Sequence, residues 1–541
     1  MSQPITNAIP SGHIGNISPE QDYALKQMWA SFFALDGTSE PGKTATGAPV
    51  DLTEAKKHVA DLGGFVKFHE TFWRTPLSGP PDWTMLRFLR ARKWDVAAAL
   101  GMLACMIAWR VELTVDEIVE AGEEGLNRHL PGFDLQMRSG KAYLHGTDAQ
   151  GRIVIYIHVQ IHNSRQQTFE ALRTFTIFSV ETGGLFLAPP TNQACLVFDL
   201  TNFGLSNMDW AFIKFLVKAF EAYYPETLGV LAIHKAPWVF STIWGAIRSL
   251  LDPVVASKVV FTKNEKQLKQ VINAEQLPKS QSSSITNILF QSLRASSSSA
   301  LRPSHYPFRV PVYSPSQFLP PPFLSSFFSY LFLSLYQPLS VFSLPFLTKL
   351  SSTAMGGDED WAWKYTDCVP DENARMHDPV QHAAHLAIRA ARRDAFEVAT
   401  RAWITSPSPA TAHARDQAVL EYRIASIEAD PFIRPRTVYH KHGNLLEDGT
   451  ARWSYKGGAG DQVFGVPVET LRGMLKIGEG EGAVPETDGD GDVVPAVDGD
   501  VQEKVVVYGN GSRDGVHEIG NGLEEKMGAL DVNTATQAVT A

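Results

Sequence analysis

The sequence has 541 residues, 44% of them hydrophobic, a net charge of −10 and a sequence pI near 5.9. This length supports one large core or two modest ones, and the acidic balance argues against a broad basic surface for nucleic acid. Three cysteines, Cys105, Cys195 and Cys368, show no short metal-ligand spacing. They argue against a disulfide framework and fit a reducing cytosol. The opening MSQPITNAIPSGHIGN has neither the basic nor the apolar region of a secretory signal.

The N-terminal part predicts a helical lobe, residues 18–135, after a disordered stretch, residues 1–17. Ser18-Pro19-Glu20-Gln21 places a cap residue, a proline and a glutamine where a helix begins. Residues 82–110 predict two further helices, with Asp95 as the cap of the second.

Short runs rich in Val and Ile alternate with helix-like stretches from about Lys141 onward. The strand-like runs are residues 153–159, 194–200, 230–234 and 258–262. The helix-like stretches are residues 168–182, 209–223 and 241–251. Strands that alternate with helices predict an α/β fold with covered sheet faces.

Residues 280–354 differ in composition from the rest of the chain. They contain 20 Ser, nine Pro and nine Phe but no Asp, Glu or Gly. The longest uncharged run without proline, residues 323–337, is shorter than the roughly 20 residues that a membrane span needs. We therefore interpret the segment as a disordered low-complexity insert and keep a membrane span as the alternative.

The C-terminal part predicts a helix from Asp378-Pro379 to about Trp403, irregular strands and turns over residues 430–470, and an acidic disordered tail, residues 476–541. The tail contains the string DGDGD at residues 488–492. A calcium loop would need glycine at Val493 and glutamate at Gly499, so this reading is rejected.

Four segments carry a family resemblance. They are LRFLRARKWDVAAALGMLACMIAWR (86–110), Gly151-Arg152 before IVIYIHV, LVFDLTNFGLSNMDW (196–210) with EAYYPETLG (221–229), and IHKAPWVFSTIWGAIRSLLDPVVASKVVFT (233–262). Together they resemble the CRAL-TRIO family, which includes the yeast secretory phosphatidylinositol/phosphatidylcholine transfer proteins. The strings SNMD, YYPE, HKAPW and LDPVVASK are most similar to a fungal branch associated with phosphatidylinositol transfer. The resemblance covers about residues 80–280.

The resemblance implies a helical lobe packed on a mixed sheet that floors an apolar lipid cavity with a gating helix. The lipid-binding domain would span residues 136–279, and residues 355–475 would continue it. Residues 241–251 place five apolar side chains at helical spacing, which alone favours a core helix, whereas the resemblance favours a gate. The residues expected at the cavity and gate are Ile243, Trp244, Ile247, Leu250, Leu251, Phe203 and Phe215.

The resemblance also assigns the lipid headgroup to Arg92, Lys93 and Lys258, because cations bind phosphate through charge-assisted hydrogen bonds. Spacing alone would make these residues solvated surface charges. Phosphatidylinositol is therefore the expected cargo of a lipid-transfer protein.

Several positions depart from the family pattern. Phe215 stands where phosphatidylinositol-binding members have an acid, and Val255 stands where they have a threonine. Ile155 and Gly204 replace hydroxyl residues of the phosphatidylcholine-binding members, whereas Ser206 keeps one hydroxyl. These changes argue against phosphatidylcholine and keep a squalene-like or sterol-like cargo as an alternative.

Three polar residues have functional alternatives: Asp199 as a catalytic acid, and His158 and His234 as haem ligands, since some members of the family bind haem. His158, His234 and Asp199 occur in strand-like runs, where a satisfied structural role is the ordinary interpretation. No nucleophile elbow, phosphate loop or metal-ligand cluster accompanies them, so we expect no enzyme, no metal and no cofactor, haem included. The predicted protein is a cytoplasmic monomer, peripheral at membranes, that binds phospholipid and no nucleic acid. A regulator that senses lipid and presents it to a kinase is a further alternative.

The insert interrupts a family feature. Leu277-Pro278-Lys279 and Gly356-Gly357 correspond to an "LP" turn and a glycine pair that are adjacent in the family. We therefore expect Gly356 to lie close to Pro278 in space. The codons for Ser, Phe, Leu and Pro are rich in pyrimidines, so a retained intron translated in frame is a plausible origin of the insert.

Overall fold

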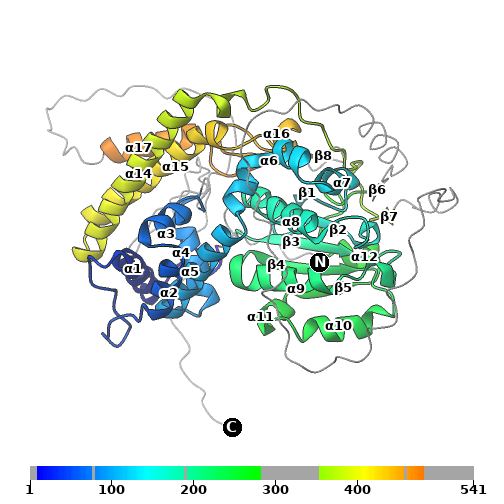
Figure 1. The fold of residues 1–541 in the computed structure, drawn as a ribbon, viewed down its shortest axis with the longest axis horizontal. Coiled ribbons are helices and arrows are strands. Elements are labelled where there is room, and N and C mark those ends of the chain that lie inside the picture. The colour runs from blue at the N-terminus through cyan, green and yellow to red at the C-terminus, as the bar shows by residue number, and fades with distance from the viewer. Residues whose placement is uncertain (1–8, 76–78, 188–191, 282–352, 456–459, 481–541) are drawn as a thin grey trace, which may run out of the picture.

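The computed structural model describes residues 9–75, 79–187, 192–281, 353–455 and 460–480. These residues form a helical lobe, a mixed sheet with helices on its faces, and a long C-terminal pair of helices beside the lobe (Figure 1). The α/β fold class predicted from the sequence is confirmed.

The helical lobe begins with α1, Pro19–Phe33, whose first turn has the predicted cap. The Gln21 backbone N–H donates to the Ser18 hydroxyl (3.3 Å), and the Ser18 N–H donates to the Gln21 side chain (2.9 Å). The other helices of the lobe are α2 (Thr53–Asp61), α3 (Phe65–Phe72), α4 (Asp82–Ala91), α5 (Val96–Glu112), α6 (Val115–His129) and α7 (Phe133–Ser139). Aromatic rings join α1 to α3, with 4.6 Å between the ring centroids of Phe32 and Phe72.

The chain turns sharply between α4 and α5, whose axes differ by 115°. Lys93 and Trp94 adopt left-handed backbone conformations there, with φ of 52° and 69°. Asp95 then caps α5, as predicted, by accepting a hydrogen bond from the Ala98 N–H (3.0 Å). This turn carries Arg92 and Lys93 at its exposed surface.

The central sheet has five strands in the order β1-β2-β3-β4-β5. They are β1 (Ala142–Thr147), β2 (Ile153–His158), β3 (Ala194–Asp199), β4 (Leu228–His234) and β5 (Val259–Thr262). β1 pairs antiparallel with β2, and the other neighbours are parallel. The four parallel strands were predicted, whereas β1, with the sequence AYLHGT, was not.

Helices connect the parallel strands, and one more, α12, follows the last strand. They are α8 (Phe169–Gly184), α9 (Trp210–Lys218) with the π-helical turn η4 (Ala219–Tyr223), α10 (Phe240–Arg248), α11 (Pro253–Ser257) and α12 (Glu265–Leu268). Alternate residues of each strand face opposite sides: Ile153 and Leu196 join the core with α5 and α8, whereas Val154 and Val197 pack against Leu268 and its neighbours. The shorter helical turns are η1 (Ala34–Asp36), η2 (Val159–Ile161), η3 (Leu205–Asn207) and η7 (Ala374–His377).

The two ends of the predicted insert meet in the structure. β6 (Ser280–Gln281) pairs antiparallel with β7 (Thr353–Ala354), and the Gly357 N–H donates to the carbonyl oxygen of Pro278 (3.2 Å). A side chain at Gly357 would collide with the carbonyl of Leu277, so the close approach requires glycine. The expected return of Gly356 to the vicinity of Pro278 is confirmed, since its N–H donates to the carbonyl of Lys279 (3.2 Å).

The expected disorder of the insert concerns residues 282–352, which lie outside the described residues, as does the run at 323–337. Among the helices that are described, none is by itself long and apolar enough to cross a membrane. The bent pair α4–α5 reaches that threshold by length and composition when both helices are taken together.

The C-terminal extension begins with two long helices, α14 (Pro379–Thr405) and α15 (Pro409–Ile433), which lie side by side along the helical lobe (Figure 1). Phe396 of α14 is fully buried against Trp29, at 5.4 Å between centroids. Arg415 of α15 donates to Asp82 (2.6 Å), which also accepts from the indole N–H of Trp29 (2.7 Å). The helix starting at Asp378-Pro379 was predicted, but α15 was not.

Two further parts of the extension cover the outer edge of the sheet: α16 (Val438–Lys441) and the hairpin of β8 (Ala451–Tyr455) and β9 (Gly460–Phe464). The last helix, α17 (Val468–Gly480), packs against α15 instead. The hydroxyls of Tyr439 and Tyr455 accept the N–H groups of Leu144 (2.8 Å) and Thr147 (2.9 Å). These bonds satisfy donors of the edge strand β1 that have no neighbouring strand.

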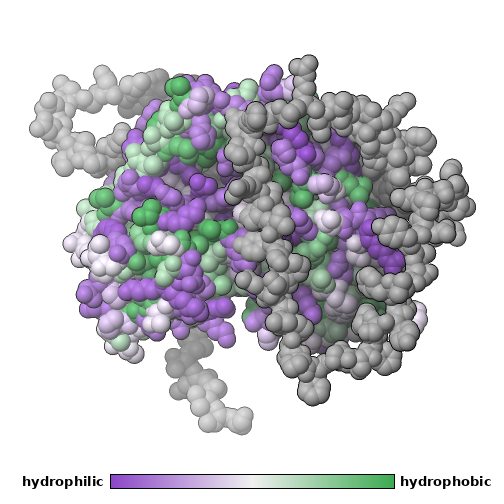
Figure 2. Space-filling view, viewed as in Figure 1, coloured by the Kyte–Doolittle hydropathy of each residue, from purple (hydrophilic) through white to green (hydrophobic). Residues whose placement is uncertain are grey.

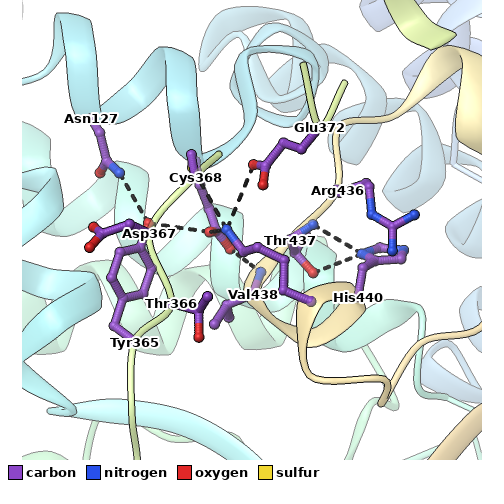
Figure 3. A network of polar contacts seen from close by, with 12 residues as sticks. Asn127, Tyr365, Thr366, Asp367, Cys368, Glu372, Arg436, Thr437, Val438 and His440 are labelled. Atoms are coloured by element: carbon purple, nitrogen blue, oxygen red, sulfur yellow. Dashed lines mark hydrogen bonds and ion pairs between the residues drawn. The ribbon is translucent and has the colours of Figure 1, made fainter. Parts of the chain in front are cut away.

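A buried polar network fixes the extension to α6 (Figure 3). The carboxylate of Glu123, which is fully buried, accepts hydrogen bonds from the Val438 N–H (2.6 Å), Lys441 Nζ (3.0 Å) and the Tyr365 hydroxyl (3.2 Å). Lys441 Nζ also lies 3.7 Å from Glu372. Burial raises the pKa of Glu123, and its cationic partner Lys441 opposes that shift.

Two boundaries of expected disorder need correction. Residues 9–17 are not disordered: they form turns with a bridge between His13 and Asn16, and the Gly12 carbonyl accepts from Arg90 (2.7 Å). The helix α17 extends through residues 476–480, which we had assigned to the acidic tail. The remaining tail, with its DGDGD string, lies outside the described residues.

Candidate functional site

The predicted gate helix α10 lies over the carboxyl ends of the parallel strands. Phe240 of α10 is buried in a cluster with Leu200 and Ile233 from the ends of β3 and β4. Ile243, Trp244 and Ile247 pack half-buried around this cluster, as does Phe203. The ring of Phe203 lies 5.8 Å from that of Phe240, and the ring of Trp244 lies 5.3 Å from that of Phe261 on β5.

The other three predicted cavity residues lie outside this cluster. Leu250 is exposed and Leu251 is half-buried in the turn after α10. Phe215 lies on α9, 6.1 Å from the rings of both Phe169 and Phe212, and packs against the main core. The structure therefore brings together four of the seven residues.

The surface around α10 exposes large apolar side chains. Neither α9 nor α11 has a fully buried residue, and α10 has only Phe240. Trp238, just before α10, is 87% exposed. The other exposed apolar residues on these elements and the adjoining turns are Leu205, Trp210, Leu250, Val254, Val260 and Phe261. Large exposed apolar side chains on neighbouring elements are typical of a contact with a membrane or a partner.

The surface of the helical lobe and α14 has a different character (Figure 2). Apolar and polar residues are interspersed there over the helical lobe and α14. Val380, Ile388 and Val398 are single exposed apolar residues on α14. Scattered residues of this kind are ordinary on a protein surface.

Among the described residues, no hydrogen bond or ion pair links the three predicted headgroup residues to one another. Arg92 and Lys93 are exposed at the α4–α5 turn. Lys258 ends α11 and lies 3.7 Å from the carboxylate of Glu226, with 20% of its side chain exposed. Lys258 is therefore a paired, half-buried cation, and the two residues at the turn are solvated ones.

Glu226 links Lys258 to a cation that the sequence analysis missed. Burial lowers the pKa of Arg90 to about 10, and the nearby charge of Glu226 opposes that shift. Glu226 itself has a left-handed backbone, with φ of 60°. Both residues occur in the quoted family strings, LRFLRARK and YYPE, but their spacing gave no sign that they meet.

A buried ion pair also joins the helical lobe to the sheet domain. Arg110 of α5 donates to both oxygens of Glu181 on α8 (2.8 and 3.1 Å) and to Asp116 (2.9 Å). The Tyr224 hydroxyl donates to the same Glu181 (2.8 Å). Burial alone would raise the pKa of Glu181, but the Arg110 guanidinium outweighs it and holds that pKa below its usual value.

The Arg110–Glu181 pair lines two cavities. One, of about 130 Å3, lies between the helical lobe and the sheet, with Arg87 and Asn192 in its wall. The other, of about 510 Å3, lies between α6, the end of α8 and the α14–α15 pair, with Arg389 and Arg434 in its wall. The sequence could not indicate this pair, because 71 positions separate its members.

His158, His234 and Asp199 make hydrogen bonds within the sheet, although Nε2 of His234 has no partner among the described residues. His158 contacts Asp199 (3.2 Å) and the Tyr143 hydroxyl (3.0 Å) through its two ring nitrogens, and His234 contacts the Thr262 hydroxyl (2.9 Å). Asp199 also accepts from the N–H and hydroxyl of Thr201 (3.0 and 2.6 Å). These contacts give the three residues structural roles. Within the described residues, no group of three or more His, Cys, Asp or Glu side chains is arranged to hold a metal ion.

Comparison with known proteins matches two parts of the chain to family models. The CRAL/TRIO domain matches residues 137–281, and the CRAL/TRIO N-terminal domain matches residues 24–104. The extension after residue 281, which contains α14 and α15, lies beyond both matches.

Three relatives illustrate the similarity. Phosphatidylinositol transfer protein CSR1 of Eremothecium gossypii is 39% identical over 245 residues, covering 45% of this chain and 56% of that protein. CRAL-TRIO domain-containing protein C3H8.02 of Schizosaccharomyces pombe is 44% identical over 209 residues, covering 38% of this chain and 47% of that protein. SEC14 cytosolic factor of Eremothecium gossypii is 30% identical over 261 residues, covering 45% of this chain and 78% of that protein. The chain thus spans about half the length of the first two relatives.

Proposed function

The chain belongs to the CRAL-TRIO family, and from this premise we propose that it is a lipid-transfer protein. In this proposal it extracts a single membrane lipid, phosphatidylinositol, and carries it between membranes as a cytosolic monomer. It acts without covalent chemistry and touches the membrane only transiently. The printed names of two relatives, a phosphatidylinositol transfer protein and a cytosolic factor, support the cargo and the location.

The observation that carries the proposal is the half-buried state of α10. Its residues Ile243, Trp244 and Ile247 are apolar, yet they are only partly covered by the cluster at the strand ends. Trp238 beside them is almost fully exposed. An apolar helix that is neither buried nor solvated suits a gate that faces lipid on one side and a bilayer on the other.

Such a protein meets a definite energetic need. Burial of one methylene gains about 0.8 kcal/mol, so a diacyl lipid with roughly 30 methylenes is held in a bilayer by on the order of 20 kcal/mol or more. Spontaneous escape into water is correspondingly slow. An apolar protein cavity offers the acyl chains a second apolar phase, so the lipid exchanges at the membrane without crossing water.

Two alternatives keep specific support. A neutral squalene-like or sterol-like cargo is favoured by Ile155, Val255 and Phe215, which replace polar family residues and pack against the main core. A lipid-sensing regulator that presents its lipid to a kinase is favoured by the α14–α15 pair, which lies outside the family matches and offers a further surface.

Mass spectrometry of organic extracts from the purified protein tests the cargo. Recovery of phosphatidylinositol supports the proposal, and recovery of neutral lipid alone contradicts it in favour of the squalene-like alternative. Vesicle-to-vesicle transfer then separates a carrier from a sensor, because a sensor binds lipid without net transport.

The variant Ile247→Asp tests the gate in the same transfer assay. A charge on the apolar face of α10 opposes both lipid loading and membrane docking, so transfer should fall about tenfold or more. Thr242→Asp is the matched control, because Thr242 is exposed on the same helix. Normal transfer by Ile247→Asp would show that α10 does not gate.

A further inference from the structure

The cavity of about 130 Å3 between the helical lobe and the sheet lies apart from the gate. Its floor includes Ile153, Ala194 and Leu228, which are the first residues of β2, β3 and β4. The α10 cluster instead contacts the sheet at the opposite, carboxyl ends of these parallel strands. The two features therefore occupy opposite ends of the sheet.

Three residues in the wall of this cavity each have a buried side-chain atom without a hydrogen-bond partner among the described residues. These atoms are Nε of Arg87, Nε of Arg110 and Oδ1 of Asn192. Arg110 and Asn192 are only 5% and 8% exposed. Buried polar atoms are nearly always bonded, to protein or to something else, so three unsatisfied atoms around one small cavity indicate a polar occupant.

The charged side chains around the cavity indicate the sign of the charge on that occupant. Arg110 is matched by the carboxylates of Glu181 and Asp116. Arg87, by contrast, makes no hydrogen bond and no ion pair with any residue that the structure describes. Glu181 is the carboxylate whose charge acts on Arg87, but its oxygens are already bonded to Arg110 and Tyr224. A largely enclosed cation without a directly bonded counter-ion is costly, so the cavity favours an anion.

The remaining wall suits an oxyanion in particular. The Asn192 amide presents its NH2 group in place of its oxygen after a half-turn of the side chain, so it is able to donate. The hydroxyl residue Thr84 on α4 also lines the cavity. A guanidinium with convergent amide and hydroxyl donors is the usual means of binding phosphate.

We propose that this cavity binds a phosphate-class oxyanion, held by the guanidinium of Arg87 together with Arg110 Nε–H and the side-chain amide of Asn192. The oxyanion is supplied either as free phosphate or as the phosphate of a lipid headgroup. The inference does not depend on phosphatidylinositol being the cargo, because the occupant is defined by the cavity alone.

Thermal unfolding of the full-length, delipidated protein tests the site with inorganic phosphate as the probe. A ligand that binds only the folded state raises the unfolding midpoint in proportion to the logarithm of its concentration. The midpoint of the wild type should rise with phosphate and not with chloride at equal ionic strength. Isothermal titration calorimetry then gives the dissociation constant.

Arg87→Gln should weaken phosphate binding about tenfold or more, because a charge-assisted hydrogen bond is lost. Asn192→Ala should weaken it severalfold, and it serves as the second variant if Arg87→Gln fails to fold. Arg128→Gln is the matched control: Arg128 pairs with Glu124 on the exposed surface of α6, and its removal should leave phosphate binding unchanged.

The source of the oxyanion is distinguished by repeating the titration on protein loaded from phosphatidylinositol vesicles. Phosphate binding that persists after loading assigns the cavity to the free ion. Phosphate binding that loading abolishes assigns it to the headgroup, and both results support the site. A phosphate effect no larger than that of chloride, or an equal effect in Arg87→Gln, overturns the proposal.

Discussion

The buried contact between Asp82 and Arg415 should hold the C-terminal extension to the helical lobe. Arg415 is 1% exposed at its side chain and donates to Asp82 at 2.6 Å. Its guanidinium also lies over the rings of Trp403 (4.4 Å) and Phe396 (5.0 Å). Asp82→Asn keeps the shape of the acceptor for Trp29 but removes the negative charge, so Arg415 loses its directly bonded carboxylate, and Asp416, which is beyond ion-pair distance, is left as the nearby counter-charge.

The magnitude follows from that loss. Removing one partner of a buried ion pair costs about 3–5 kcal/mol of unfolding free energy. Arg415→Met should cost a similar amount, since it leaves Asp82 uncompensated and also loses the aromatic contacts. In the double variant neither charge remains, so its loss should fall short of the sum of the single losses by about 2–3 kcal/mol.

Urea unfolding of the full-length protein, followed by tryptophan fluorescence, measures all three variants, because Trp29 lies in this contact. The control is Arg392→Met, which removes an exposed pair with Glu421 in the same two helices and should change stability by less than about 1 kcal/mol. Strictly additive losses from the two single variants would refute the reasoning.

Three further predictions concern other parts of the molecule. Lys258→Ala should reduce phosphatidylinositol transfer yet cost less than about 1 kcal/mol in urea unfolding, because its pair with Glu226 is partly solvated at 3.7 Å; a larger loss would make Lys258 structural. Burial raises the pKa of Asp416 to about 6. The folded state therefore holds a proton that the unfolded state releases, and stability should fall as pH rises from about 4 to 6. Asp416→Asn should remove this loss, gaining up to about 2 kcal/mol at pH 7 and nothing below about pH 4, and a gain that is equal at both pH values would contradict the sign. Replacing residues 282–352 by a short Gly-Ser turn should leave lipid binding intact, because the flanking strands β6 and β7 are already paired. It should also improve solubility, because it removes nine phenylalanines. Loss of bound lipid in the extract would assign the segment to the lipid domain.

The elements that the sequence predicted are those with a strong local signal. The four parallel strands are nearly continuous runs of Val, Ile and similar residues, because helices and the extension cover both of their faces. The starts of α1, α5 and α14 were readable because Ser18, Asp95 and Asp378 cap them directly.

The elements that were missed depend on distant partners. β1 contains His145, Gly146 and Thr147, and its outer edge is completed by tyrosines about 300 positions later in the chain. Gly146 has a φ of +65°, and a side chain there would come within 2.7 Å of the Tyr455 hydroxyl. No local pattern contains that information.

The residues of the candidate site also divide into those with a local sequence signal and those that depend on distant partners. The apolar face of α10 follows from its helical spacing, so Ile243, Trp244 and Ile247 were found together. The cavity between the helical lobe and the sheet depends on Arg87, Glu181 and Asn192, which lie on different elements and come together only in the folded chain.

The pairing of β6 with β7 has a practical consequence for handling this protein. Gln281 and Thr353, the described residues on either side of residues 282–352, are paired directly opposite each other in the ladder. An insertion site of this kind accepts an inserted domain whose N- and C-termini are close together, whatever the size of that domain. A fluorescent protein inserted there would be carried without displacing either terminus, and it would report on the abundance and position of the lipid domain in a living cell.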